Sequence, residues 1–309
     1  MQVEDGELKI IRPSLVYNYD NILLDKKDIH KILLKANINN KINDLKIWQI
    51  AFIHNSYSSK VKKNRKYTGF ITNLKDQELT DDDYKDYSDC LQIQPDSNEN
   101  LEWLGDSILK AITAAYLIKR YPSQDEGFRT RLRSKLERTE MLSKFAKHYG
   151  FEKYLVISKH IEDNCNGRNN LHILEDAFEA FIGAMYIDFG EEGKAYDICR
   201  KFVIKTLEDC VDFTDLIVND DNYKDQLMRF YQKKFNGKFP IYSQELYDEE
   251  NKLYHMCVVH PLTNKVVGKG KAQSKKKAEQ LSAKYALKFF NVIKEDLTSS
   301  SSDEDLSVA

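Results

Sequence analysis

The chain has 309 residues, of which 41% are hydrophobic and 31% are charged, which is long enough for two ordinary domains with packed cores. It contains no run of 18 or more apolar residues, so the sequence predicts no membrane span. The net charge of −2 hides a division, because residues 222–294 hold 15 basic and 6 acidic residues, or +9, and the remainder holds 32 and 43, or −11. An acidic body joined to a basic module predicts one part that binds a polyanion and another that handles metal.

The cysteines and the N-terminus indicate the cellular compartment. Five cysteines, an odd number, are widely spaced and form no C-x-x-C pair, which favours neither a disulfide framework nor a zinc site. The first ten residues are acidic and lack an apolar segment, which argues against a secretory signal. We therefore expect a reduced, intracellular protein.

The N-terminal third begins with residues 1–27, which show no strong pattern and are expected to form a loosely held arm. Apolar residues at helical spacing follow over residues 28–48. His54 and Ser56 are not surrounded by a nucleophile elbow, so we expect a helix end with His54 hydrogen-bonded locally. Residues 60–97 pass from basic to acidic and tyrosine-rich, which predicts a partly disordered loop or insertion; the alternative is a secondary RNA-contacting or partner surface.

Residues 98–109, NENLEWLGDSIL, hold three acids at helical spacing. On a helix, Glu99, Glu102 and Asp106 would share one face, beside leucine and isoleucine side chains. Like charges at this spacing cost a few tenths of a kcal/mol per pair, so a divalent cation is the candidate counter-ion. The alternative is an ordinary solvated acidic face.

The stretch that follows is basic. After a stop at Tyr121-Pro122, residues 125–149 predict one amphipathic helix that Gly150 ends. Basic residues cluster near its start, just after Glu126; they are Arg129, Arg131, Arg133 and Lys135. Such a cluster is usually a solvated face, but beside a carboxylate site it would also meet phosphates. Residues 163–170 predict a polar loop.

A second apolar helix is predicted over residues 172–190, and it presents Asp176 and Glu179 on one face. Unpartnered carboxylates are costly to bury. Two helices that each offer an acidic pair from an apolar surface make an oxygen-only cage, which suits Mg²⁺ or Mn²⁺. The alternative is that one pair forms salt bridges with the arginine-rich helix. A closing helix and linker are expected over residues 191–215.

The last part of the chain predicts a separate module with the element order α-β-β-β-α over residues 222–294. Its second helix opens at Ser274, a candidate N-cap. Lys275, Lys276 and Lys277 follow at the helix N-terminus, where the dipole and free N–H groups favour phosphate. Residues 213–221 are expected to be a linker, and the acidic, serine-rich residues 295–309 a disordered tail.

Several ordered motifs together resemble the ribonuclease III family. ENLEWLGDS at 99–107 is similar to the family's ERLEFLGDS, and DAFEAFIGAMYID at 176–188 is similar to its DVFEALIGAIYLD. HNSY at 54–57 and the dipeptide Glu126-Gly127 match two further elements. GKGKAQSKKKAEQ in the last module resembles a double-stranded-RNA-binding domain. The likeness covers roughly residues 28–294.

The resemblance implies an all-α endonuclease domain over residues 28–212, followed by a small α+β double-stranded-RNA-binding domain over residues 222–294. It implies a homodimer that hydrolyses double-stranded RNA to 5′-phosphate and 3′-hydroxyl ends with two-nucleotide 3′ overhangs, using Mg²⁺ with Mn²⁺ as a substitute. One metal or two stays open. The metal-binding catalytic residues would be Glu102, Asp106, Asp176 and Glu179, with Glu99 and Glu126 as further catalytic-site acids lining the cleft. RNA would be contacted by Lys224, Ser274, Lys275, Lys276, Lys277, Arg129, Arg131 and Arg133. The dimer interface would include Trp103 and Leu104.

Some positions depart from the family pattern. His172 stands where many relatives have lysine, and Met228-Arg229 replaces a frequent Gln-Glu pair. DEENKLYH replaces the loop between the first two strands, which puts minor-groove contacts in doubt but not the lysines on phosphates. Two rival functions are a non-catalytic RNA-binding protein and a metal-dependent hydrolase of small phosphate esters. The six acids argue against the first and the +9 module against the second. The motifs place the enzyme in RNA processing or small-RNA metabolism without naming a substrate.

Overall fold

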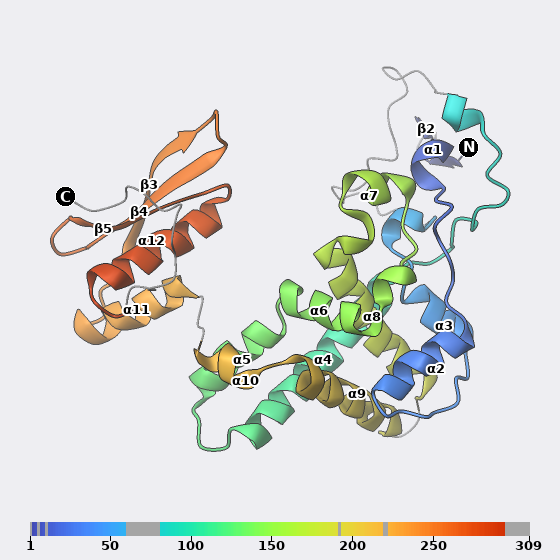
Figure 1. The fold of residues 1–309 in the computed structure, drawn as a ribbon, viewed down its shortest axis with the longest axis horizontal. Helices are drawn as coiled ribbons and strands as arrows, with labels where there is room; N and C mark the ends of the chain where they lie inside the picture. The colour runs from blue at the N-terminus through green and yellow to red at the C-terminus, as the bar shows by residue number, and fades with distance from the viewer. Residues whose placement is uncertain are drawn as a thin grey trace. The chain divides into compact units, whose positions relative to one another are not determined.

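The computed structural model describes residues 2–4, 7–9, 12–59, 81–190, 193–218 and 222–293 (Figure 1). The chain divides into two compact units, Met1–Leu216 and Ile217–Ala309. The predicted tail at 295–309 and the first part of the predicted insertion, residues 60–80, lie outside the described residues.

The described part of the first unit is mainly helical, which confirms the all-α prediction for this domain. A short antiparallel pair at the N-terminus, with Gln2 opposite Lys9, precedes the helices. The elements are β1 (Gln2–Glu4), β2 (Glu7–Lys9), α1 (Pro13–Val16), α2 (Lys26–Lys35), α3 (Leu45–Ile50), α4 (Glu99–Arg120), α5 (Glu126–Leu136), α6 (Thr139–Tyr149), α7 (Lys159–Asn164), α8 (Leu171–Asp188), α9 (Lys194–Cys210) and α10 (Phe213–Val218).

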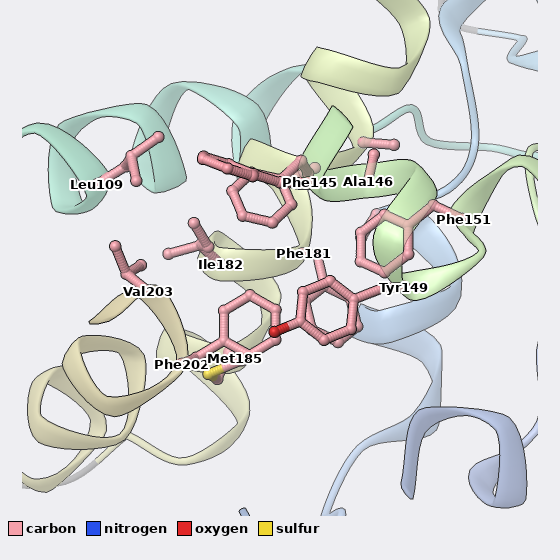
Figure 2. Close-up of a cluster of buried hydrophobic side chains, with 14 of the residues drawn as sticks. Leu109, Phe145, Ala146, Tyr149, Phe151, Phe181, Ile182, Met185, Phe202 and Val203 are labelled. Atoms are coloured by element: carbon pink, nitrogen blue, oxygen red, sulfur yellow. The ribbon is translucent and has the colours of Figure 1, made fainter. Parts of the chain in front are cut away.

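Helix α8 runs through the middle of this unit, and α3, α4, α6 and α9 all contact it. Phe181 is fully buried and its ring lies 4.9 Å from that of Trp48 and 5.4 Å from that of Phe202. Figure 2 shows Phe181 and Met185 next to Tyr149 of α6 and Phe202 of α9. At the end of α8, the carboxylate of Asp188 accepts hydrogen bonds from the backbone N–H groups of Asn43 and Asp44 at 3.1 and 2.6 Å. The helix is thus fixed along its whole length.

The segment before α2 differs from the expected loosely held arm. Arg12 forms a buried ion pair with Asp83 at 2.7 Å, and Ser14 also donates to that carboxylate. Val16 and Leu24 are buried. The second part of the expected insertion, residues 81–97, is therefore packed against the N-terminal segment. Arg12 and Asp83 are 71 residues apart in the sequence, which is why local composition did not reveal their contact.

The predicted helix over residues 125–149 is two helices, α5 and α6, which are separated at Glu137 and Arg138. The apolar stripe of α5 ends at Leu136, because positions 139 and 140, where it would continue, are Thr139 and Glu140. Gly150 ends α6 in the left-handed region at φ 79°, as its sequence predicted. Similarly, part of the predicted loop at 163–170 is helical, because α7 continues to Asn164.

The predicted linker at 213–221 contains α10, and this helix belongs in part to the first unit. Phe213 and Leu216 are buried in that unit's core. The carbonyl of Leu216 also accepts a hydrogen bond from the buried ammonium group of Lys135 at 2.9 Å. The compact unit therefore extends to residue 216 and not to residue 212.

The second unit has the predicted α-β-β-β-α order. Its antiparallel sheet has the strand order β3-β4-β5 and packs against two helices. The elements are α11 (Tyr223–Lys234), β3 (Ile241–Asp248), β4 (Leu253–Val259), β5 (Val266–Ala272) and α12 (Lys275–Phe289). Gly268 and Gly270 let β5 approach α12 closely, because added Cβ atoms would lie 2.3 Å from the carbonyl oxygen and 2.4 Å from the amide nitrogen of Ser282.

Candidate active site

The two acidic helices cross at a pair of glycines. A Cβ atom on Gly105 of α4 would lie 1.8 Å from the carbonyl oxygen of Glu179, and one on Gly183 of α8 would lie 2.2 Å from the carbonyl oxygen of Leu101. These distances are impossible for any larger residue. The glycines thus let the two backbones touch, which brings the acids of α4 against the acids of α8.

Glu179 lies at the centre of this crossing and is 8% exposed. Burial, together with the negative charges of Asp106, Glu175, Glu102 and Asp176, raises its pKa to about 9. Burial disfavours the charged form of this carboxyl, and the four acidic neighbours act in the same direction. Glu179 is therefore a group that would ionise when a cation enters the cluster.

The other three acids of the predicted cage are only partly buried. Glu102 and Asp106 lie one turn apart on α4, and Asp176 lies one turn before Glu179 on α8. Their donor atoms are all carboxylate oxygens, the ligand type that Mg²⁺ and Mn²⁺ take. In the described part of the chain, no group of three or more such side chains is already arranged to enclose an ion. By the chemistry of its donors, the cluster fits a hard divalent cation.

The two further acids of the predicted site lie at helix starts. Glu99 is the first residue of α4, and Ser97 donates to its carboxylate at 3.5 Å. Glu126 is the first residue of α5, exposed, and accepts a 2.7 Å hydrogen bond from Thr130. Neither is among the charges that act most strongly on Glu179. The places of Glu99 and Glu126 at the site therefore stay a prediction.

Three residues that the sequence reasoning did not name act on the cluster. Lys110 forms an ion pair with Asp106 at 2.6 Å, and its position one turn after an acid is a signal that was available. Glu175, beside Asp176, raises the pKa of Glu179. Glu137 at the end of α5 is close enough to sense Asp106 and Lys110, and only the tertiary fold reveals it.

The arginines predicted to meet phosphate mostly have partners within the first unit. Arg129 donates to the carbonyl oxygens of Tyr121 and Gln124 at 3.1 and 2.5 Å. Arg133 lies beside Glu137, with 3.6 Å between its Nε and the carboxylate. Arg131 is half-buried on the same helix. This helix is therefore held in place by its arginines, and their contact with RNA stays a prediction.

Comparison with known proteins places these features in a family. A ribonuclease-III-like family model matches residues 44–207, and a double-stranded RNA binding motif matches residues 223–289. The chain belongs to the ribonuclease III family. The predicted enzyme class, a double-stranded-RNA-specific endoribonuclease, is confirmed at the level of this family.

Individual relatives agree with the assignment. A "Probable ribonuclease 3" of Acanthamoeba polyphaga mimivirus is 34% identical over 282 residues, which cover 90% of this chain and 48% of the relative. A "Ribonuclease 3" of Sulfurovum is 33% identical over 235 residues, which cover 75% of this chain and 97% of the relative. The chain thus spans about half the length of the viral relative. A solved structure of the ribonuclease III nuclease domain from Campylobacter jejuni is 21% identical with a TM-score of 0.43, and the match covers 59% of this chain and 97% of that one. The family assignment rests on the sequence matches.

The RNA-binding motif of this ribonuclease III displays its lysines at one helix start. Lys275, Lys276 and Lys277 are exposed at the N-terminus of α12. Ser274 caps that helix by accepting from the amide of Lys277 at 3.3 Å. Lys224 differs, because it forms an ion pair with Glu279 at 2.5 Å and lies over the ring of Tyr242. If Lys224 binds RNA as predicted, its ammonium group must contact a phosphate as well as the Glu279 carboxylate.

The remaining predicted positions of this ribonuclease III are on its surface. Trp103 of α4 is 74% exposed, and Leu104 beside it is partly buried against the core. His172 is exposed and lies 3.2 Å from the carboxylate of Glu175. Met228 is partly exposed, and Arg229 pairs with Asp225 at 3.1 Å. Among the described helices, none combines the length and the apolar character needed to cross a bilayer.

Proposed function

We propose that this chain is a Mg²⁺-dependent endoribonuclease that cuts double-stranded RNA to 5′-phosphate and 3′-hydroxyl ends with short 3′ overhangs. The observation that carries the proposal is the buried Glu179 at the glycine crossing, surrounded by carboxylates of α4 and α8. The exposed lysines at the start of α12 supply the reason for a polyanionic substrate. The activity belongs to RNA processing or small-RNA metabolism inside the cell.

The residues of the crossing have distinct tasks in this mechanism. Glu102, Asp106, Asp176 and Glu179 would hold Mg²⁺, which on binding supplies an activated water and stabilises the leaving 3′-oxygen; Mn²⁺ is expected to replace it. Glu179, whose carboxyl pKa is raised by burial and by its acidic neighbours, would have to release its proton to serve as a ligand. Glu99 and Glu126, at the starts of their helices, border the substrate path.

The second unit would position the duplex. Such modules recognise the A-form shape of RNA across successive minor grooves and place lysines on the intervening phosphates. Lys275, Lys276 and Lys277 are exposed at a helix N-terminus, where the dipole adds to their attraction for phosphate. We expect binding with little regard to sequence and with a steep dependence on salt.

We also propose that the enzyme is a homodimer. Trp103 leaves 74% of a large apolar side chain exposed beside the metal-binding acids Glu102 and Asp106. Aromatic side chains of this kind are enriched at protein interfaces. The first unit contains one set of the six acids, so two active sites require two copies of the chain.

The experiment is a comparison of cleavage and binding with labelled duplex RNA. Wild-type protein should cut it with Mg²⁺ and leave it intact with EDTA. Glu179→Gln should bind the duplex with unchanged affinity and should not cut it. Glu140→Gln removes an acid from an exposed position on α6 and is the control that should cut normally. Cleavage by Glu179→Gln at the wild-type rate would remove this residue from the mechanism.

The same assay separates the two rival functions. A non-catalytic RNA-binding protein would bind the duplex but leave it uncut in the presence of Mg²⁺ and Mn²⁺. A hydrolase of small phosphate esters would be inhibited by nucleotides and not by duplex RNA. We expect the opposite pattern of inhibition.

A further inference from the structure

The strongest unassigned feature lies around Lys110, one turn after Asp106 on α4. Its ammonium group is 2.6 Å from the carboxylate of Asp106, and this hydrogen bond raises the pKa of Lys110. The charges of Glu137 and Glu179 act on it in the same direction. About half of the Lys110 side chain is exposed, so it can change partner at little cost in packing. In the metal-free protein, Lys110 therefore provides positive charge to an acidic cluster.

Glu137, the residue that caps the C-terminus of α5, is close enough for its charge to act on Lys110, and Lys110 acts on Glu137 in return. It ends α5, its side chain is only 14% exposed, and burial raises the pKa of its carboxyl to about 7. Among the described residues, its buried Oε1 atom has no hydrogen-bond partner. The basic group beside it, Arg133, is 3.6 Å from the other oxygen, too far for a hydrogen bond. A buried acceptor without a donor is costly, so this oxygen is suited to receive one.

These two observations describe a cation that is held by one acid and a second acid that is able to take it. We propose that Lys110 is a built-in counter-ion of the carboxylate cluster, and that Glu137 is the positioning residue that receives its ammonium group when a divalent cation engages Asp106. The inference rests on the proposed function, because it assumes that Asp106 holds the ion.

The physical reason is competition for one carboxylate. Lys110 and a divalent cation both require Asp106, and two positive groups this close repel each other. Glu137 offers Lys110 a second, partly buried acceptor, so that the ammonium group can release Asp106 and still have a carboxylate partner. Without Glu137, Lys110 keeps a stronger hold on Asp106 and competes with the ion. Glu137 thus favours metal binding without being a ligand.

The experiment measures the affinity of the full-length protein for Mn²⁺ by isothermal titration calorimetry, without RNA. Glu137→Gln should weaken binding about tenfold, in the range seen when an outer partner of a metal ligand is removed. Lys110→Met should bind as tightly as wild type or more tightly. In the double variant, the weakening caused by Glu137→Gln should disappear, because the competitor is gone.

Three controls keep the outcome clear. Glu140→Gln removes one exposed negative charge from the next helix and should leave Mn²⁺ affinity unchanged. Thermal unfolding in EDTA should give closely similar midpoints for the Glu137→Gln and wild-type proteins, which separates the effect from a folding defect. Absence of Mn²⁺ binding by wild-type protein would reject the metal site itself.

Two results would overturn the role of Glu137 while leaving the metal site intact. One is unchanged affinity in Glu137→Gln. The other is an equal weakening in the wild-type and Lys110→Met backgrounds, which would mean that Glu137 acts on the ion directly or on the fold.

Discussion

The two units use the same packing device but place their charges in opposite surroundings. In the first, Gly105 and Gly183 let two helices touch; in the second, Gly268 and Gly270 let a strand touch a helix. The first unit buries Glu179 at that contact, whereas the second exposes Lys275 and its neighbours at a helix end. The buried carboxyl depends on backbone geometry, whereas the exposed lysines depend on their place at a helix start.

This contrast predicts where a single methyl group has the largest effect. Gly183→Ala should destabilise the first unit by about 3 kcal/mol or more, because its Cβ would lie 2.2 Å from the backbone oxygen of Leu101. Urea unfolding followed by circular dichroism measures the change. Gly127→Ala is the matched control, since its Cβ would meet side-chain atoms and no backbone: the flexible end of Arg131 at 3.3 Å and a carboxylate oxygen of Asp125 at 3.5 Å. A midpoint that Gly183→Ala leaves unchanged would contradict the close crossing.

The second prediction concerns the buried carboxyl of Glu179 in the first unit. The pKa of Glu179 is about 9 in the folded metal-free protein and 4.5 as its ordinary value, so between these pH values the folded state holds a proton that the unfolded state releases. The free energy of unfolding should therefore fall as pH rises from about 5 to about 9. In Glu179→Gln this dependence should weaken, and the variant should be more stable than wild type at pH 8.

Thermal unfolding in EDTA at a series of pH values tests the difference between the two proteins. If stability changes with pH by the same amount in wild type and Glu179→Gln, the carboxyl of Glu179 is not protonated at neutral pH. With Mg²⁺ added, the stability of the wild-type protein should rise and not fall with pH, because the ion stabilises the ionised carboxylate. The Glu179→Gln variant should not show this reversal.

The third prediction concerns the exposed charges and has the smallest effect per residue. Replacing Lys275, Lys276 and Lys277 together by glutamine should reduce affinity for duplex RNA. It should also lower the slope of log affinity against log salt by about one for each phosphate that is no longer neutralised. Each single substitution should give only part of this change. Cleavage at saturating RNA should be unaffected, because the nuclease acids are untouched.

Fluorescence anisotropy at several salt concentrations measures these slopes. Lys233→Gln, at an exposed position near the end of α11, removes the same charge from the same unit and should have a smaller effect. An equal reduction for Lys233→Gln and Lys276→Gln would mean that binding depends on total charge and not on the start of α12.

Local patterns predicted the elements that carry the site. The helices with Glu102, Asp106, Asp176 and Glu179 follow from their apolar patterns, because α4 has one face in the core and α8 is buried over most of its surface. Ser274 was predicted as a cap because its role depends on residues only three positions away.

What the sequence did not reveal depends on contacts between distant residues. The ion pair of Arg12 with Asp83 joins two segments that look loosely held when read separately. The break between α5 and α6 was missed because the sequence is basic and amphipathic on both sides of it. Glu137 has no motif, and its relation to Lys110 exists only because α5 ends near α4.

Asp188 belongs to the same acidic motif as Asp176 and Glu179, but its role is structural. It ends the stretch that begins with Asp176, yet it accepts hydrogen bonds from the amides of Asn43 and Asp44, one on each carboxylate oxygen. An amide side chain at this position would offer only one acceptor oxygen to the two donors. The negative charge of Asp188 is thus used at the amino end of α3, where it anchors the C-terminus of α8, while the N-terminal half of the same helix holds Asp176 and Glu179.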